Sequence, residues 1–167
     1  MTDDDWLPPL LEVEWNDYAG TVERAHAIFQ RDFGIASTRP SFRGRRLGLK
    51  HHPELEARSA TFWHMVTEGK VEADRTPDRA RLERIGWPRA IIAHADVASR
   101  VRVWCVPMGR DRRWHLALSD FSYLVVLADR GEFVLPWTAF CVDREHQREK
   151  LESRWSAWDA MVQRQKS

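Results

Sequence analysis

The chain has 167 residues, of which 43% are hydrophobic and 31% are charged. A chain of this length forms one domain with its own core, and the hydrophobic share excludes an intrinsically disordered protein. No apolar run reaches the roughly 18 residues that a membrane span needs, so we expect no membrane partner. The acidic start "MTDDDWLPPL" lacks the features of a secretion signal, and the cysteines Cys105 and Cys141 have no metal-type spacing. These features favour a cytoplasmic protein with reduced thiols.

The formal net charge of +1 is unevenly distributed along the chain. Residues 1–17 hold six acidic residues and no Lys or Arg, so all 26 basic residues lie in residues 18–167. We interpret residues 1–17 as an acidic N-terminal arm and residues 18–167 as a single domain. Two basic clusters, "RPSFRGRRLGLKHH" (39–52) and "GRDRRWH" (109–115), suit a polyanion such as nucleic acid. The alternative is that they form a solvated loop and a solvated hairpin tip.

Candidates for nucleic-acid binding come from these clusters and from a later turn. They are Arg43, Arg45, Arg46, Lys50, His115 and Arg130. Nine tryptophans also recur through the chain. Most should be core residues, because a tryptophan buries a large apolar area, but one or two exposed beside arginines would stack on bases.

The N-terminal half is predicted to be helical after an extended arm. The predicted elements are a helix over 17–33, a helix over 53–69, a helix over 76–86, and a brief strand or turn over 87–92. The first is indicated by an apolar face and ends at Gly34. Pro53 is predicted to begin the second helix, because proline is tolerated in a first turn, and Gly69 to end it. The third begins with an N-cap at Thr76.

The C-terminal half is predicted to be a sheet followed by a helix. Four strand-like runs, separated by turn signals, lie over 101–106, 112–118, 122–129 and 132–142. Short connections imply antiparallel pairing, and Pro136 indicates an edge position or a bulge. A charged helix over 144–165 packs through Leu151, Trp155, Trp158 and Val162. The fold class is therefore α+β, with N-terminal helices, a four-stranded antiparallel sheet and a C-terminal helix.

Most motifs of enzyme chemistry are missing from the sequence. There is no HExxH, no paired CxxC, no phosphate-binding glycine loop and no GxSxG. We therefore predict neither a metal site nor a cofactor. The remaining reactive residues are His, Arg, Thr and Lys, a set that suits metal-independent RNA cleavage through a ribose 2′-hydroxyl. Arginine suits the phosphate, because its planar fork holds two oxygens at once.

His64 in "TFWHMV" is the first catalytic candidate. In a regular helix it lies about 200° from the apolar stripe that contains Phe62. Its expected neighbours are small or polar: Ala57, Ala60, Thr61, Thr67 and Glu68. Glu68, one turn further on, is expected to hold the charge of the imidazolium. The alternative is a partly buried histidine satisfied by a backbone carbonyl.

Three arginines are further candidates for phosphate binding. In "RARLERIGW", Arg81 and Arg84 lie one turn apart and share a face. In the strand over 112–118, Arg113 and His115 share the face opposite the apolar residues. The alternatives are a solvated helix with salt bridges and an ordinary exposed strand face.

Three segments carry a family resemblance: "TFWHMVTEG", "RARLERIGWPRAIIAHAD" and "RRWHLALSDFSYLVVLADRGEFVLPWTAFCVDREHQREKLESRW". Together they resemble a group of small phage- and prophage-associated bacterial proteins, which is itself similar to the barnase–EndoU–colicin–RelE class of ribonuclease domains. The resemblance covers about residues 53–155, and the order of helices followed by a four-stranded antiparallel sheet matches. It implies that residues 18–167 form a ribonuclease-like domain.

The resemblance also implies a function. The protein would be a metal-independent endoribonuclease, a toxin or phage-conflict effector that acts on tRNA or mRNA, with a cognate antitoxin or immunity protein as a partner. His64 would match the helix histidine of that class, Arg113 the strand arginine and Thr138 the strand hydroxyl. Arg81 and Arg84 would fall in the intervening basic element. Two other functions stay open: a non-catalytic nucleic-acid-binding module, and an interaction partner that uses the acidic arm or a tryptophan patch.

Overall fold

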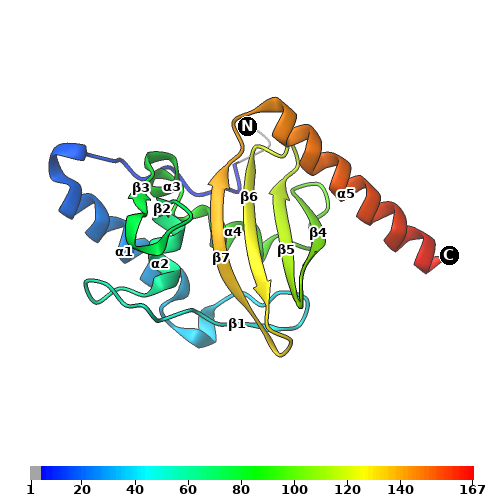
Figure 1. Cartoon of the computed structure of the whole chain (residues 1–167), viewed down its shortest axis with the longest axis horizontal. Coiled ribbons are helices and arrows are strands. Elements are labelled where there is room, and N and C mark those ends of the chain that lie inside the picture. The colour runs from blue at the N-terminus through cyan, green and yellow to red at the C-terminus, as the bar shows by residue number, and fades with distance from the viewer. Residues whose placement is uncertain (1–4) are drawn as a thin grey trace.

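A five-stranded sheet forms the middle of the computed structural model, which describes residues 5–167 (Figure 1). Four strands form the predicted antiparallel meander: β4 (Val101–Met108), β5 (Asp111–Leu118), β6 (Tyr123–Asp129) and β7 (Phe133–Cys141). Gly109 and Gly131 have positive φ at the two tight turns, a conformation that glycine adopts without steric cost.

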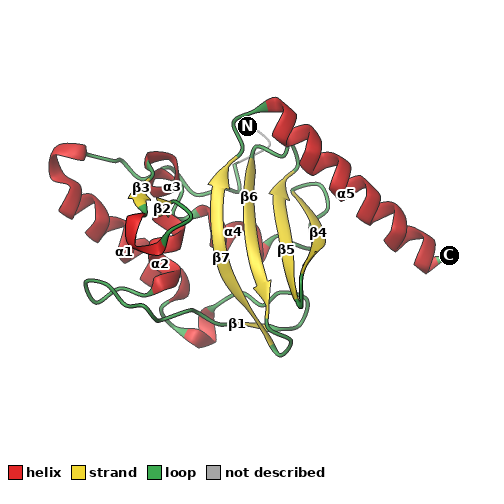
Figure 2. Cartoon of the chain, viewed as in Figure 1, coloured by secondary structure: helices red, strands yellow, loops and turns green. Residues whose placement is uncertain are grey.

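This sheet has one strand more than the four that were predicted. A two-residue strand, β1 (Arg46–Leu47), pairs in parallel with β7, so the strand order is β1-β7-β6-β5-β4. Sequence patterning did not reveal β1 because two residues are too short for an alternating pattern. The α+β class is confirmed. Figure 2 shows most of the other helices to the left of the sheet and α5 (Glu145–Lys166) to its right.

The first predicted helix is confirmed, and the second is much shorter than predicted. Helix α1 spans Tyr18–Phe33, whereas α2 spans only Ala60–Val66. The side chain of Ser59 caps α2 by accepting a hydrogen bond from the Phe62 N–H. Residues 53–59 form a loop instead, because Glu56 and Ala57 have positive φ, which a right-handed helix excludes. After α2 the chain forms a small hairpin of β2 (Thr67–Glu68) and β3 (Thr76–Pro77).

The next two helices also differ from expectation. Helix α3 spans Arg79–Glu83, and its N-cap is Asp78, whose side chain accepts from the Arg81 N–H, rather than Thr76. Helix α4 spans Trp87–Ala93, where a strand or turn was predicted. Its proline lies in the first turn, where it removes no helical hydrogen bond. Periodicity cannot distinguish a buried helix from a buried strand over so few apolar residues.

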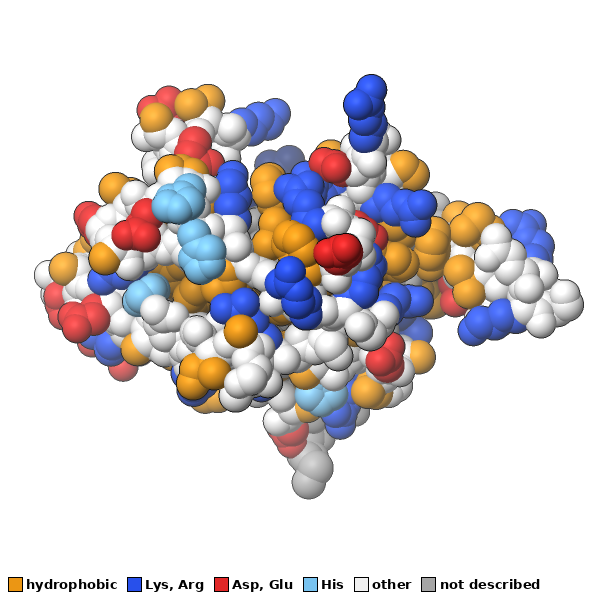
Figure 3. All heavy atoms as spheres, turned by 90° about the horizontal axis from the view of Figure 1, so that it is seen from below, with side chains coloured by type: hydrophobic (Ala, Val, Ile, Leu, Met, Phe, Trp, Pro, Cys, Tyr) orange, Lys and Arg blue, Asp and Glu red, His pale blue; other side chains and the backbone are white. Residues whose placement is uncertain are grey.

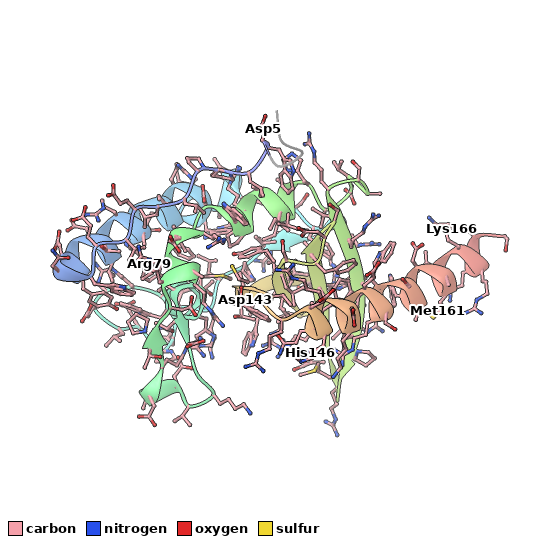
Figure 4. All side chains as sticks on the ribbon, turned by 90° about the horizontal axis from the view of Figure 1, so that it is seen from above. Asp5, Arg79, Asp143, His146, Met161 and Lys166 are labelled. Carbon is pink, nitrogen blue, oxygen red and sulfur yellow. The ribbon has the colours of Figure 1, made fainter. Side chains whose placement is uncertain are left out.

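The sheet separates two cores. The larger core lies between the sheet and helices α1–α4, and it includes Phe29, Phe62, Ile91, Leu116 and Val125. The smaller core lies on the other face, under the first half of α5, where Leu151, Trp155 and Trp158 pack. Val162, predicted to belong to the same stripe, packs against neither core. Figures 1 and 4 show α5 continuing past the edge of the sheet toward Lys166.

The predicted N-terminal arm is described from Asp5 onward, so Asp3 and Asp4 lie outside the described residues. Residues 8–14 have no helix or strand, and hydrogen bonds join them to α3, to α4 and, from Glu14, to α1. The Leu11 N–H donates to the Glu83 carbonyl at 2.7 Å, and Trp87 Nε1 donates to the Pro8 carbonyl at 2.9 Å. In the part of the chain from residue 5 to 167, no helix combines the length and apolar character that crossing a membrane requires.

Candidate functional site

A cavity of about 380 Å³ opens on the α5 side of the sheet, between β7 and the β2–β3 hairpin. Three predicted catalytic residues, His64, Arg81 and Thr138, line it together although they come from α2, α3 and β7. The other lining residues are Gly69, Lys70, Glu72, Arg75, Trp137 and Phe140. Figure 3 shows Lys and Arg side chains gathered beside hydrophobic side chains, in a hollow between two projecting parts of the surface.

His64 is buried in this cavity and pairs with a carboxylate. The residue is 8% exposed, and Nε2 lies 2.9 Å and 3.1 Å from the two carboxylate oxygens of Glu72. The predicted partner, Glu68, was wrong: it lies exposed in β2. The alternative, a backbone carbonyl as the partner of the His64 ring, is not seen among the described residues either. Sequence reasoning missed Glu72 because it lies eight residues after His64, beyond a chain reversal that no local pattern marks.

The hydrogen bond to Glu72 sets the tautomer of His64. An ionised carboxylate only accepts hydrogen bonds, so Nε2 carries the proton and Nδ1 of the neutral ring has a free lone pair. Among the described residues Nδ1 has no hydrogen-bond partner, and it is not one of the buried unpaired atoms. In the neutral ring, Nδ1 is therefore an accessible proton acceptor on a residue that lines the cavity.

Arg75 holds the turn that carries Glu72. Its Nε donates to Thr67 Oγ1 at 2.9 Å, its Nη2 to the Thr67 carbonyl at 2.6 Å, and its Nη1 to the Gly69 carbonyl at 2.6 Å. Gly69 has a φ of 132°, which a residue with a side chain would not readily adopt. These contacts fix both ends of the β2–β3 hairpin and position its carboxylate against α2.

Arg81 connects the three segments of the cavity. Its Nη1 donates to the carbonyls of His64 (3.1 Å) and Thr67 (2.8 Å) and to Thr138 Oγ1 (3.1 Å). Its guanidinium also lies 5.4 Å from the centre of the Phe140 ring. Burial lowers the pKa of Arg81, and the neighbouring Asp78 carboxylate opposes that shift. Arg81 is thus a positioning residue as well as a cation at the cavity wall.

A β-bulge brings Thr138 and Trp137 onto the same face of the sheet. Val126 pairs with Thr138 and the next residue, Leu127, pairs with Pro136, so Trp137 is the extra residue. The predicted bulge near Pro136 is confirmed. Because of it, adjacent residues of β7 both line the cavity instead of alternating between faces.

Trp137 is surrounded by cations. Its ring centre lies 4.5 Å from the Arg113 guanidinium carbon, 5.5 Å from Lys50 Nζ and 6.0 Å from the Arg130 guanidinium carbon. The His64 ring meets it edge-on, with centroids 5.6 Å apart. Three predicted residues, Arg113, Lys50 and Arg130, therefore gather beside the cavity. Sequence reasoning did not single out Trp137, although it did expect a tryptophan beside arginines.

Four other predicted arginines lie elsewhere. Arg84 donates to the Ala80 carbonyl and stacks at 5.0 Å on Trp87, so it does not share the cavity with Arg81. The remaining three bind the loop to the sheet: Arg45 to Asp129, Arg43 over Trp114, and Arg46 over Phe133. Helical spacing had placed Arg84 beside Arg81, and the basic cluster had suggested Arg43, Arg45 and Arg46; the structure directs all four side chains to other contacts.

His115 lies on the predicted face of β5 but not as a cation. It packs against Trp104, with ring centroids 5.2 Å apart, directly opposite it in the β4–β5 register. Burial lowers the pKa of His115 to about 4, with a smaller contribution from Arg154. The ring is therefore neutral at pH 7 and offers no charge to a phosphate.

Within residues 5–167, no three His, Cys, Asp or Glu side chains gather as ligands for a metal ion. Comparisons of the chain with models of protein families, with curated proteins and with solved structures found no match.

Proposed function

We propose that this protein is an endoribonuclease that cleaves RNA without a metal ion, with the cavity around His64 as its active site. The observation that carries the proposal is the His64–Glu72 pair in a cavity that also holds Arg81 and Thr138. Together they supply a proton acceptor, a cation and a hydroxyl group, which are the groups that 2′-hydroxyl attack on a phosphate requires.

His64 is the general base. Its Nδ1 takes the proton of a ribose 2′-hydroxyl, and the Glu72 carboxylate at Nε2 stabilises the imidazolium that forms. The 2′-oxygen then bonds to the adjacent phosphorus while the bond to the 5′-oxygen breaks. The 5′-oxygen takes a proton from water, and the hydroxide that remains takes the proton of the His64 imidazolium. The products are a 2′,3′-cyclic phosphate and a 5′-hydroxyl end.

The cations of the cavity stabilise the charge that develops on the phosphate. Thr138 Oγ1 accepts its hydrogen bond from Arg81, so the Thr138 hydroxyl proton is available to a phosphate oxygen. Arg113 has a buried Nη1 without a partner among the described residues, which suits it to a ligand oxygen. Lys50 and Arg130 add charge beside Trp137.

The biological role follows from the resemblance and belongs to the same proposal. The protein acts as a toxin or phage-conflict effector on tRNA or mRNA in the cytoplasm, and a cognate antitoxin or immunity protein restrains it. Expression of the wild type in a bacterial host should arrest growth, whereas expression of His64→Ala should not. Equal growth with both would remove the role of a toxin but not the chemistry.

Cleavage of single-stranded RNA by the purified protein in EDTA tests the chemistry. We expect the wild type to cleave and His64→Ala to lose at least 100-fold in rate (roughly the contribution of a general base). His94→Ala is the matched control, because His94 lies in the turn after α4 and hydrogen-bonds the Ala90 carbonyl. RNA binding without cleavage would replace this proposal by a non-catalytic binding module.

A further inference from the structure

A second hollow adjoins the His64 cavity on the same face of the sheet. It has a volume of about 240 Å³ and lies between strands β6 and β7 and the first turns of α5. Phe140 lines both hollows, so the two adjoin at its side chain. The other lining residues are Leu124, Val142, Gln147, Lys150, Leu151 and Arg154.

We call this second hollow the α5 groove, and its floor and rim differ in chemistry. Leu124, Phe140 and Val142 give the sheet side an apolar surface, whereas Lys150 and Arg154 form a basic rim on α5. These two residues are one helical turn apart and therefore share a face of the helix. Neither has a carboxylate within 4.0 Å among the described residues.

We propose that the α5 groove is a second nucleotide subsite for single-stranded RNA, in which a base packs on Phe140 and the next phosphate binds Lys150 and Arg154. The inference rests on the proposed function, because it extends the substrate of the His64 cavity by one nucleotide. Two observations support it. Phe140 lines both hollows, and neither Lys150 nor Arg154 forms an ion pair among the described residues.

Single-stranded RNA fits this arrangement better than a duplex does. Unstacked bases pack on aromatic side chains, and an aromatic ring stands at the junction of the hollows. Both hollows lie on the face of the sheet that α5 covers at one end, while the β2–β3 hairpin borders the His64 cavity. In a duplex the bases are paired inside the helix, and only the phosphate backbone would reach this face.

Binding of an uncleavable RNA tests the subsite independently of catalysis. The probe is a 2′-O-methyl hexanucleotide, which lacks the attacking hydroxyl, and its dissociation constant is measured over a range of salt concentrations. The variant carries Lys150→Gln and Arg154→Gln. We expect about tenfold weaker binding, and a salt dependence shallower by about 0.7, because the variant no longer neutralises the one phosphate of the subsite.

The matched control carries Arg164→Gln and Lys166→Gln, which remove the same charge from the last turns of the same helix. It should bind the hexanucleotide as the wild type does. Equal weakening by both variants would overturn the subsite, since it would reflect net charge alone, and so would no weakening by the groove variant. Cleavage assays separate the two proposals. If the wild type binds the hexanucleotide in this pattern but does not cleave RNA, the endoribonuclease is refuted and the subsite is not.

Discussion

The side chains of Arg81 and Thr138 meet at 3.1 Å although 57 residues separate them in the chain. The contact joins α3 to the bulged segment of β7, and the same Nη1 also binds the carbonyl of His64. One guanidinium thus fixes the distance between the histidine and the hydroxyl of the candidate site. Both the geometry and the charge of the site therefore depend on the Arg81 side chain.

Replacing Arg81 should therefore destabilise the fold more than replacing Arg84. We expect Arg81→Ala to lower the free energy of unfolding by roughly 3 kcal/mol, because it leaves three acceptors without their donor. Arg84→Ala should cost about 1 kcal/mol, since the Arg84 side chain, just after α3, makes a 3.3 Å bond to the Ala80 carbonyl, a 3.7 Å ion pair with Glu83 and an aromatic contact. Urea denaturation measures both, and equal losses would show that Arg81 does not connect the site.

Glu72→Gln should lower RNA cleavage by about 100-fold without unfolding the protein. The amide retains the size of the side chain but removes the negative charge that stabilises the imidazolium. Glu72 is about half exposed, so the free energy of unfolding should change by less than about 1 kcal/mol. Glu68→Gln, in the same hairpin, is the control. If Glu68→Gln reduced the rate as much, the pairing with Glu72 would not be the active one.

Arg45 and Arg113 should separate stability from RNA affinity. Arg45 Nη1 donates to Asp129 at 2.6 Å and, with Trp114, lowers the pKa of that carboxyl to about 2. Arg45→Gln should thus lower the free energy of unfolding by roughly 1–3 kcal/mol and leave RNA binding nearly unchanged. Arg113→Gln should instead weaken RNA binding about tenfold. The reverse pattern would place the RNA at the Arg45 loop.

His115 should make stability depend on pH. The pKa of His115 is about 4 in the folded protein and about 6.5 in the unfolded chain. The unfolded chain therefore binds the extra proton first, and the stabilisation present above pH 6.5 is lost as the pH falls toward 4. From pH 7 to pH 4.5 the wild type should lose roughly 2 kcal/mol more than His115→Gln. Parallel pH curves for the two proteins would contradict burial of a neutral His115.

The sheet could be predicted from the sequence because its signals are local. Each long strand has seven to nine residues, β6 is a continuous apolar run, and a glycine with positive φ marks the turn of two of the three hairpins. Pro136 likewise marked the bulge that places Trp137 and Thr138 on one face. The helical region was less predictable, because α2, α3 and α4 have only five to seven residues each. The loop before α2 was also missed, because a Glu-Ala pair gives no sequence signal for the positive φ that Glu56 and Ala57 adopt.

The candidate site was predicted only in part, for a related physical reason. His64 and Arg81 were selected by residue type and helical spacing, and Thr138 by the family resemblance. The proximity of the three depends on tertiary packing that spacing does not encode. Helical spacing selected Glu68 as the partner of His64, whereas the chain reverses after Gly69 and brings Glu72 back to the ring. The basic loop supplied a long run of cations, but the structure uses Arg45 to bind its own sheet.

The central claim is that RNA is cleaved by attack of its own 2′-hydroxyl in the His64 cavity. The most direct measurement uses DNA oligonucleotides that contain a single ribonucleotide, one for each base, incubated with the wild type in EDTA. Cleavage should occur only on the 3′ side of the ribonucleotide, leave a 2′,3′-cyclic phosphate, and be lost in His64→Ala. Cleavage of all-DNA strands, a 5′-phosphate product, or an active His64→Ala protein would contradict this mechanism.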